Sequence, residues 1–359
     1  MRSVTNWDRT SSCFGSITSG LRDSVSTFCE EANMARPKVL ATRPLFPAAQ
    51  KILDGSCDVD YWTRPESISK EELLRRVADK GGLVCLLNDK VNEELLAAAP
   101  KLRIVANVAV GYDNIAVADC TKRGVAATNT PGVLDETTAD FAWTLLMAVA
   151  RRLGEGEALA RSGKWTGWDL DQLVGADVWG KTLGLVGFGR IGRAVARRAS
   201  GFQMKVVYHD AVRVPLDVER GFHAEYREFS ALLAEADFVS LHVPLMPETR
   251  GLFNAKTFSQ MKPTSFLINT ARGPVVDEAA LVQALENKKI AGAALDVYEK
   301  EPLINPGLKR PNVVLAPHIA SASLETRTKM ACMAAENVVA LLKGRRPPNI
   351  LNPEVLKTS

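Results

Sequence analysis

Three side chains suited to acid–base chemistry each follow a strand-like apolar run in the second half of the sequence. Arg272 comes after residues 265–269, Glu301 after residues 291–297, and His318 after residues 313–316. In an open parallel sheet, ligands bind beyond the carboxyl ends of the strands. An imidazole there can exchange a proton near neutral pH, and a guanidinium can bind an anion. The three residues are therefore a candidate catalytic set.

A glycine-rich loop lies upstream of this set and predicts a dinucleotide site. Residues 187–192 read G-x-G-x-x-G, directly after the strand-like run 182–186 and at the start of a helix that reaches about residue 199. Gly187 permits a tight turn, Gly189 lets the backbone approach a pyrophosphate, and Gly192 allows close helix–strand packing. The amide groups of Arg190 and Ile191 would then face the phosphates at a helix N-terminus.

Asp210 follows the next strand-like run, 18 residues after the last glycine of the loop (210 − 192 = 18). An acid at about this distance binds the adenosine ribose hydroxyls and disfavours a 2′-phosphate, so it predicts NAD over NADP. Arg213 could turn toward such a phosphate, which keeps NADP as the weaker alternative. His209 is expected at the adenosine edge or as a capping residue.

The two motifs together predict reduction of a 2-keto acid, for which a nicotinamide would supply the hydride. Arg272 could clamp a carboxylate or polarise the carbonyl, and His318 could donate the proton to the carbonyl oxygen. Glu301 would orient the imidazole ring and stabilise the imidazolium. His242, also at a strand end, competes as acid–base group, although its loop is expected to line the adenine side. His223 is expected to be exposed.

The positioning elements alternate short apolar runs with amphipathic stretches, a pattern typical of α/β folds with parallel sheets. Two such series follow one another, so we expect two doubly wound domains. Helices are expected at 70–78 and 93–99. The expected strands are residues 38–42, 57–61, 83–86, 104–107, 125–128, 182–186, 205–208, 238–242, 265–269, 291–297 and 313–316.

Two long helices define the expected domain boundaries. The capping box at residues 137–140 predicts a helix from about 138 to 152, apolar on nearly all sides and therefore buried under a domain junction or in a subunit interface. A final helix, about 323–342, has no strand after it and should pack back on the first domain. The predicted substrate domain is thus discontinuous, and the predicted domains are 36–133 plus 319–359 (substrate) and 134–318 (NAD-binding).

Residues 1–35 are predicted to form a disordered tail, because they lack apolar periodicity and match neither a secretory signal nor a transit peptide.

The net charge is +4 and the basic pairs are scattered, which disfavours nucleic-acid binding. The longest apolar stretch, residues 141–150, is short of the ~20 residues of a membrane span. Six cysteines without metal-type spacing predict packed thiols, no metal site and a reducing, cytoplasmic compartment.

The chain resembles the D-isomer-specific 2-hydroxyacid dehydrogenases from about residue 37 to residue 353. Within that family it looks most like the glyoxylate/hydroxypyruvate reductase branch, and residues 164–168, KWTGW, add to the likeness. The other motifs that carry the resemblance are VAVGYDN (108–114), NTPGVLDETTAD (129–140), VGFGRIG (186–192), HVPLMPET (242–249), INTARG (268–273), ALDVYEKEP (294–302) and APHIASAS (316–323).

The resemblance implies two doubly wound domains with the active site in the cleft between them, and a homodimer built around the cofactor domains. It implies catalytic roles for Arg272, Glu301 and His318, the same set that the strand ends indicate. By the resemblance, the cofactor contacts are Gly187, Gly189, Arg190, Ile191, Gly192, Asp210, Val243, Thr249, Thr270, Ala271 and Asp296, the last near the nicotinamide amide.

The resemblance also implies a substrate site. Backbone N–H groups of Val110 and Gly111 would hold the substrate anion, and Leu87 would line the pocket. Trp168 and Trp143 would approach the pocket across the dimer, although core packing is an equal alternative for Trp143. Relatives of this branch that use NADPH carry a basic or hydroxyl residue where Asp210 stands, which again favours NAD.

Other functions remain open from the sequence. A dimeric NAD-sensing binding protein of the same fold can retain the same three residues. Oxidation of D-3-phosphoglycerate or D-lactate uses the same chemistry, although the chain leaves no room for a regulatory domain after its last helix. Formate oxidation is disfavoured, because formate has no hydroxyl proton for a histidine to take.

Overall fold

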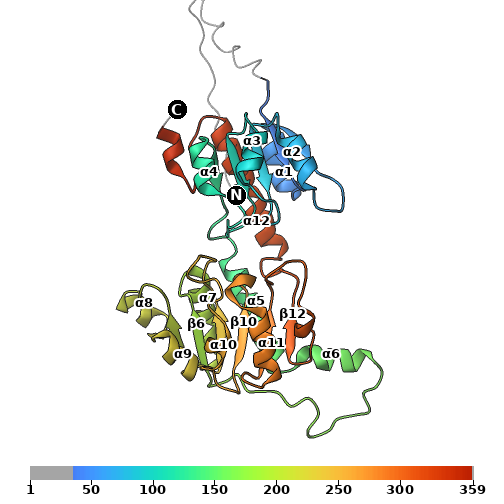
Figure 1. The fold of residues 1–359 in the computed structure, drawn as a ribbon, viewed down its shortest axis with the longest axis vertical. Coiled ribbons are helices and arrows are strands. Elements are labelled where there is room, and N and C mark those ends of the chain that lie inside the picture. The colour runs from blue at the N-terminus through green and yellow to red at the C-terminus, as the bar shows by residue number, and fades with distance from the viewer. Residues whose placement is uncertain (1–34, 358–359) are drawn as a thin grey trace, which may run out of the picture. The chain divides into compact units, whose positions relative to one another are not determined.

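A computed structural model describes residues 35–357, and residues Pro37–Ser359 form one compact unit. The predicted disordered tail therefore lies outside the described residues, apart from its last position. Within the described part, the chain builds two parallel β-sheets, one of five and one of seven strands, each covered by helices (Figure 1). The predicted α/β class with two doubly wound sheets is confirmed.

The five-stranded sheet has the order β2-β1-β3-β4-β5, and all of its strands run parallel. β3 and β4 are buried along their whole length, which explains why they carry no polar side chain except that of Asn107 at the end of β4. The strands and the helices around them are β1 (Lys38–Ala41), α1 (Pro47–Asp54), β2 (Asp58–Tyr61), α2 (Lys70–Val77), β3 (Gly82–Cys85), α3 (Glu93–Ala98), β4 (Ile104–Asn107), α4 (Val117–Lys122) and β5 (Ala126–Thr128).

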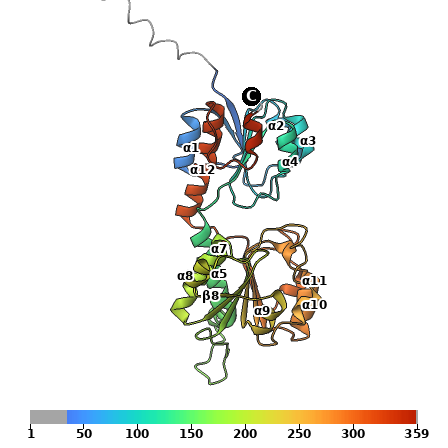
Figure 2. The ribbon, with the colours of Figure 1, turned by 90° about the vertical axis from the view of Figure 1, so that its left-hand side faces the viewer.

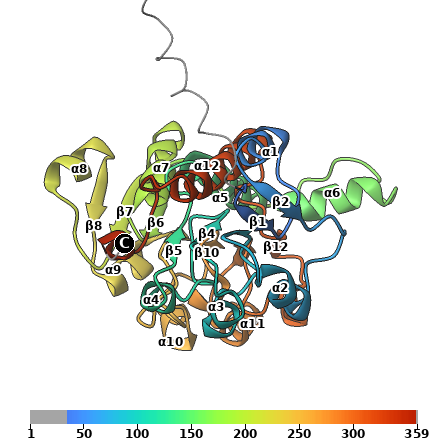
Figure 3. The same ribbon diagram turned by 90° about the horizontal axis from the view of Figure 1, so that it is seen from above.

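Helices cover both faces of this sheet, and the side-chain alternation of the strands decides which core each residue enters. Leu83 and Val105 pack under α2, α3 and α4. Their neighbours Val84 and Ile104 pack under α1 and the long helix α12 (Leu324–Leu342), which lie side by side in Figures 2 and 3. The final helix thus packs on the first sheet of the chain, as its lack of a following strand led us to expect.

The seven-stranded sheet has the order β12-β11-β10-β9-β6-β7-β8, again all parallel. The first strand of this sheet along the chain, β6, lies in the middle of the sheet. β7 and β8 are added toward one edge and β9 to β12 toward the other, so the strand order reverses between β6 and β9. Its elements are β6 (Thr182–Val186), α7 (Arg190–Ala199), β7 (Lys205–His209), α8 (Leu216–Gly221), β8 (Ala224–Tyr226), α9 (Phe229–Glu235), β9 (Phe238–Leu241), α10 (Ala255–Phe258), β10 (Phe266–Asn269), α11 (Glu278–Glu286), β11 (Gly292–Leu295) and β12 (Val313–Leu315).

One face of this sheet is covered by α5 (Asp135–Ala150) and α7, and the other by α9, α10 and α11. Nine of the sixteen residues of α5 are buried, so the prediction of a buried helix is confirmed. The predicted capping box is wrong. The helix begins three residues earlier than expected, its N-cap Leu134 makes no side-chain cap, and Thr138 is buried inside it. The carboxylates of Asp135 and Glu136 favour this earlier start.

A long connection follows α5 and contains α6 (Leu153–Arg161), none of whose residues is buried. Figures 1 and 3 show α6 and the loop after it projecting from the helices of the seven-stranded sheet.

Cys57, Cys85 and Cys120 are buried in the cores of the other sheet, and Cys13 and Cys29 lie outside the described residues. In the described part, no helix is both long and apolar enough to cross a membrane.

Candidate active site

The glycine-rich loop between β6 and α7 has the geometry that each glycine was predicted to provide. Gly187 has a φ of +95°, and a Cβ atom there would lie 2.7 Å from the carbonyl carbon of His242. A Cβ on Gly192 would lie 2.3 Å from the carbonyl oxygen of Gly187, so the helix can start close to the strand only without a side chain. A Cβ on Gly189 would meet nothing within 4 Å, so the space beside it is open.

Asp210, at the end of β7, holds this loop directly. Its Oδ2 accepts a hydrogen bond from the backbone N–H of Phe188 at 2.7 Å. The carboxylate is thereby placed beside the glycine loop, where a dinucleotide ribose would lie. Arg213 is not available to swing toward a phosphate here, because its Nε and Nη2 atoms bind the two carboxylate oxygens of Glu219 at 2.7 and 2.9 Å.

The loops after β9 and β10 carry the predicted cofactor residues Val243, Thr249, Thr270 and Ala271 at the same sheet edge. The hydroxyl of Thr249 is committed to its own loop: it donates to the carbonyl oxygen of Pro244 at 2.6 Å and accepts from the N–H of Met246 at 2.8 Å. The buried hydroxyl of Thr270 has no hydrogen-bond partner. Such an orphaned polar atom, at the end of a strand two places from β6 in the sheet, fits a bound dinucleotide.

Arg272 extends from the turn after β10, which Asn269 shapes by accepting from the N–H of Ala271 and donating to the carbonyl of Arg272. The guanidinium Nε lies 2.8 Å from Oδ1 of Asp113, and Nη1 donates to the carbonyl of Ala271 at 2.8 Å. A Cβ atom added to Gly111 would lie 1.4 Å from Nη2, so the guanidinium rests directly on that glycine. The side chain of Arg272 is 20% exposed.

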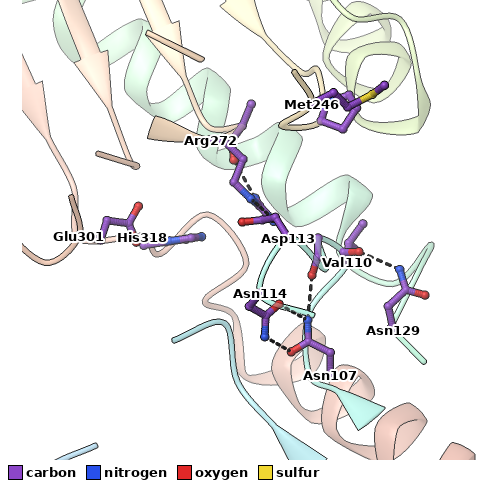
Figure 4. A network of polar contacts seen from close by, with 12 residues as sticks. Asn107, Val110, Asp113, Asn114, Asn129, Met246, Arg272, Glu301 and His318 are labelled. Atoms are coloured by element: carbon purple, nitrogen blue, oxygen red, sulfur yellow. Dashed lines mark hydrogen bonds and ion pairs between the residues drawn. The ribbon is translucent and has the colours of Figure 1, made fainter. Parts of the chain in front are cut away.

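His318 and Glu301 form the hydrogen bond that the sequence predicts. Nδ1 of His318 lies 2.8 Å from Oε2 of Glu301, and in Figure 4 the ring points from Glu301 toward Arg272 and Asp113. Burial acts to raise the pKa of the Glu301 carboxyl. The hydrogen bond and charge of His318, with smaller contributions from the Tyr298 N–H and Arg272, outweigh it and lower the pKa. Glu301 is therefore held as the carboxylate that a protonated imidazole requires.

The backbone under His318 is in the left-handed region, with a φ of 56°, which is uncommon for any residue but glycine. Asp296 holds it there from the end of β11. Its carbonyl accepts from the N–H of His318 at 2.9 Å, and its two carboxylate oxygens accept from Ile319 and Ala320 at 2.8 Å each. The Asp296 side chain has no exposed surface, and burial raises its pKa. Its predicted contact with a nicotinamide amide stays a prediction.

Close packing brings the arginine turn and the glutamate turn together. A Cβ on Gly273 would lie 1.9 Å from the backbone of Tyr298, so only glycine allows these two loops to touch. Tyr298 also donates its hydroxyl to the carbonyl of Ala316, beside His318, at 2.9 Å, and its N–H to Glu301 at 3.1 Å. This buried tyrosine thus links the loops that carry Glu301 and His318.

The loops of the five-stranded sheet contribute backbone rather than reactive side chains (Figure 4). Asn107, fully buried at the end of β4, donates to the carbonyl of Gly111 at 2.9 Å, and Asn129 donates to the carbonyl of Val110 at 2.7 Å. Asn114 donates to the carbonyls of Leu86 and Asp89 at 3.0 Å each. These amides tie the predicted anion-binding loop to the loop that contains Leu87.

The alternative histidines occupy other positions. Burial lowers the pKa of His242 to about 3, and its Nε2 lies 2.9 Å from the hydroxyl of Ser240, so it is neutral near pH 7 and unsuited to donate a proton. His209 binds the carbonyl of Arg227 through Nδ1 and packs beside Tyr226 and Phe229, while His223 is exposed as predicted.

The two tryptophans that the resemblance places near the substrate differ sharply. Trp143 is packed in the core, with its indole N–H on the carbonyl of Val195 at 3.0 Å and its ring stacked on Phe202. Of the two alternatives predicted for Trp143, the structure therefore shows core packing. Trp168 lies in the projecting loop after α6 and is 82% exposed, so its predicted contact with substrate is not made within this chain.

Sequence reasoning missed the residues that position the site. Four residues were given no role, although all of them end or follow a strand at the same sheet edge as Gly111: Asn107, Asp113, Asn114 and Asn129. An acid two residues after a predicted anion-binding glycine was the available signal for Asp113. The contact of Asp113 with Arg272, 159 residues away, has no sequence signal.

Comparisons with known proteins agree with this geometry. The family model described as "D-isomer specific 2-hydroxyacid dehydrogenase, NAD binding domain" matches residues 143–320. Two curated relatives named glyoxylate reductase, from Korarchaeum cryptofilum and Thermococcus litoralis, are 51% and 49% identical. Each alignment covers 90% of this chain, and 98% and 99% of the respective relative.

Solved structures show the same fold. A protein from Thermus thermophilus is 44% identical with a TM-score of 0.82, covering 88% of this chain and 99% of the other. An NADPH-dependent glyoxylate/hydroxypyruvate reductase from Sinorhizobium meliloti, solved with NADP and malonate, is 34% identical with a TM-score of 0.77, covering 88% of this chain and 97% of the other.

Two doubly wound sheets, a dinucleotide loop and a histidine–carboxylate pair at adjacent strand ends define a dehydrogenase that uses a nicotinamide cofactor. The chain belongs to the D-isomer-specific 2-hydroxyacid dehydrogenase family. It is an oxidoreductase of that family, with a small keto or hydroxy acid as substrate.

Proposed function

We propose that the protein reduces glyoxylate or hydroxypyruvate to the hydroxy acid, of D configuration where a stereocentre forms, with NADH. The observation that carries this proposal is the 2.8 Å pair of Glu301 and His318, with Arg272 in the same group of loops. Curated relatives with the name glyoxylate reductase, at about half identity over nearly their whole length, support the choice of substrate.

His318 is the proposed acid, which protonates the substrate carbonyl oxygen as it becomes a hydroxyl. Glu301 accepts a hydrogen bond from the Nδ1–H group of His318, which leaves Nε2 to face the substrate, and it stabilises the imidazolium. Arg272 polarises the carbonyl with its guanidinium, and the N–H groups of Val110 and Gly111 hold the substrate carboxylate. Leu87 forms the apolar wall beside them.

The nicotinamide, when bound, supplies the hydride. The residues proposed to hold the dinucleotide are the three glycines of the loop, the N–H groups of Arg190 and Ile191, and the ribose-binding carboxylate of Asp210. Val243 would line the adenine side, and Thr249, Thr270 and Ala271 would contact the rest of the dinucleotide. Asp296 would lie near the nicotinamide amide. The open space at Gly189 and the orphaned hydroxyl of Thr270 support this placement.

NAD is the proposed cofactor rather than NADP. Asp210 presents a carboxylate where a 2′-phosphate would lie, and like charges repel. The guanidinium of Arg213 is directed to Glu219, which its Nε and Nη2 atoms bind, so it does not face the ribose site to compensate. The Sinorhizobium meliloti relative is described as NADPH-dependent, so the family includes members that use the phosphorylated cofactor.

We propose a homodimer, in which the loop after α6 packs on a second copy. The loop exposes Trp165, Trp168 and Trp179 at 59%, 82% and 65%, and large exposed aromatic patches are typical of interfaces. An apolar hollow of about 700 Å³ beside Trp143 and Phe202 is a surface that such a loop could fill. The boundaries 36–133 plus 319–359 and 134–318 remain the proposed domain division.

A steady-state assay of NADH oxidation tests the proposal. Glyoxylate, hydroxypyruvate, pyruvate and phosphohydroxypyruvate are compared, and the first two should give the highest kcat/KM. Glycolate has no stereocentre, so the D configuration is checked by chiral chromatography of the glycerate formed from hydroxypyruvate. Preference for phosphohydroxypyruvate or pyruvate would favour the alternative dehydrogenases. Tight NADH binding with no turnover of any acid would favour an NAD-sensing protein.

A further inference from the structure

The ion pair between Arg272 and Asp113 joins a loop of the seven-stranded sheet to a loop of the five-stranded sheet. Nε of Arg272 lies 2.8 Å from Oδ1 of Asp113, and Figure 4 shows the two side chains meeting beside His318. The Arg272 side chain is 20% exposed and that of Asp113 is 40% exposed, so the pair is partly screened by solvent. Its value as a stabilising contact is therefore small, and its effect on the orientation of the guanidinium matters more.

This pair decides which donors of Arg272 remain for a substrate. A guanidinium has five N–H donors in a planar fork. Asp113 takes the Nε donor and the carbonyl of Ala271 takes one Nη1 donor. The edge formed by Nε and Nη2, which normally binds a carboxylate with two parallel bonds, is thus occupied. Nη2 is left pressed against Gly111, on the loop proposed to hold the substrate carboxylate.

The carboxylate of Asp113 is itself held at a fixed place. Two residues earlier, the carbonyl of Gly111 accepts from Nδ2 of Asn107 at 2.9 Å. One residue later, Asn114 accepts from Asn107 at 3.1 Å and donates to the carbonyl of Leu86 at 3.0 Å. Asp113 therefore extends from a short turn that is anchored on both sides, and it can orient a flexible partner.

We infer that Asp113 is a positioning residue for Arg272, which fixes the guanidinium so that Nη2 rather than the Nε–Nη2 fork meets the substrate. This inference rests on the proposed function and refines it. Arg272 polarises the carbonyl oxygen through a single terminal donor group, and the carboxylate is left to the backbone of Val110 and Gly111. The opposing possibility is that Asp113 acts only as a competing anion, which the substrate displaces.

The two possibilities predict opposite kinetics. Asp113→Ala frees the guanidinium, and we expect kcat/KM for the keto acid to fall about 10- to 100-fold, with kcat reduced and the KM for NADH unchanged. Asp113→Asn keeps an acceptor oxygen for Nε and should retain most of the activity. A competing anion would instead give a lower KM for the keto acid in both variants, and that result would overturn the inference.

A double-mutant cycle separates positioning from a structural role. In the Arg272→Ala background, Asp113→Ala should have no further effect, within about twofold, because its only action is through the guanidinium. Additive losses, or a lowered melting temperature with a raised KM for NADH, would contradict the inference. Asp119→Ala is the matched control, because Asp119 pairs with Lys122 on the surface of α4.

A chemical measurement makes the test independent of turnover. Phenylglyoxal modifies accessible arginines, and peptide mass spectrometry reads the rate at residue 272. Asp113→Ala should raise that rate several-fold, Asp113→Asn much less, and Asp119→Ala not at all. An unchanged rate in Asp113→Ala would refute the positioning role. An inactive wild type with the expected modification rates would refute the proposed function and leave the orientation of Arg272 by Asp113 supported.

Discussion

The two sheets contribute to the site in different ways. The seven-stranded sheet carries the reactive groups, and carboxylates hold them: Glu301 binds His318, and Asp296 binds the backbone on which that histidine sits. The five-stranded sheet offers mainly backbone, and side-chain amides such as Asn107 and Asn114 hold its shape. Reactive groups need charge and proton control, whereas an anion-binding loop needs a fixed path of the chain.

Variants that affect only one of the two sheets test this division of roles. The largest effect is expected for His318. His318→Ala should lower kcat by about 10²- to 10⁴-fold, the range for loss of a general acid, with little change in NADH affinity. Stopped-flow turnover and NADH fluorescence titration measure the two quantities. His223→Ala, at an exposed histidine, is the control. An unchanged kcat would remove His318 from the mechanism.

A substitution in the glycine loop should weaken cofactor binding strongly without changing the stability of the fold. A Cβ on Gly189 meets nothing in the protein, so Gly189→Ala should leave the free energy of unfolding within about 0.5 kcal/mol of wild type. It should weaken NADH binding by at least about tenfold, because the methyl group fills the space of the pyrophosphate. Calorimetry measures both.

Gly192→Ala is the matched contrast in that loop. Its Cβ would meet the Gly187 carbonyl oxygen, and the strain should destabilise the fold by about 1–3 kcal/mol. Normal NADH affinity in Gly189→Ala would show that the dinucleotide does not approach this glycine.

Cofactor choice should respond to a single carboxylate. Asp210→Ala removes the charge that faces the ribose, and the NADH-to-NADPH ratio of kcat/KM should fall about tenfold, equivalent to 1.4 kcal/mol. Asp217→Ala, at an exposed acid of α8, should leave the ratio unchanged. A constant ratio in Asp210→Ala would show that the ribose lies elsewhere.

The amides of the five-stranded sheet should affect substrate but not cofactor. Asn114→Ala removes the bonds to Leu86 and Asp89 and should raise the KM for the keto acid several-fold, with a loss of about 1–3 kcal/mol in the free energy of unfolding. Asn88→Ala, in the same loop region but exposed, is the control. A change confined to the KM for NADH would contradict the division of roles between the sheets.

The smallest effect concerns His242, whose burial lowers its pKa to about 3 from an ordinary value near 6.5. Between these values the unfolded chain binds a proton that the folded chain does not, so stability falls as the pH is lowered. His242→Gln removes this loss and should reduce the drop in unfolding free energy between pH 7 and pH 5 by up to about 2 kcal/mol. Urea unfolding at both pH values measures it. An equal drop in both proteins would show that His242 is already protonated in the fold.

The bounds of a strand could be predicted where the strand is buried on both faces. β4 and β6 have the bounds expected from sequence, because a strand buried on both faces is mostly apolar and a polar residue marks one end of each, Asn107 in β4 and Thr182 in β6. The pair of Glu301 and His318 could also be predicted, because both follow strands that end at the same sheet edge. The short helices α1 and α4 were not anticipated. Neither begins with a side-chain N-cap, whereas α2 and α3, which have the same lengths and were predicted, begin at the caps Ser69 and Asn92.

What escaped prediction depends on contacts that the chain makes only after folding. The cofactor contact expected of Asp296 stays a prediction, but its bonds to the N–H groups of Ile319 and Ala320, which hold the backbone beside His318, were not anticipated. The start of α5 was misplaced because a capping box is a local pattern, and tertiary burial of Thr138 overrides it. Backbone donors such as that of Gly111 are present at every position, so their selection cannot be read from residue type.

The left-handed backbone of His318 has a practical consequence for anyone who modifies this protein. An L-residue released from that conformation relaxes to a right-handed one, and the ring would then swing away from Glu301 without disturbing either sheet. A variant that loosens the Asp296 contacts would thus lose far more of its turnover than of its thermal stability. Screens for thermostability alone would accept such proteins, so selection here has to include turnover.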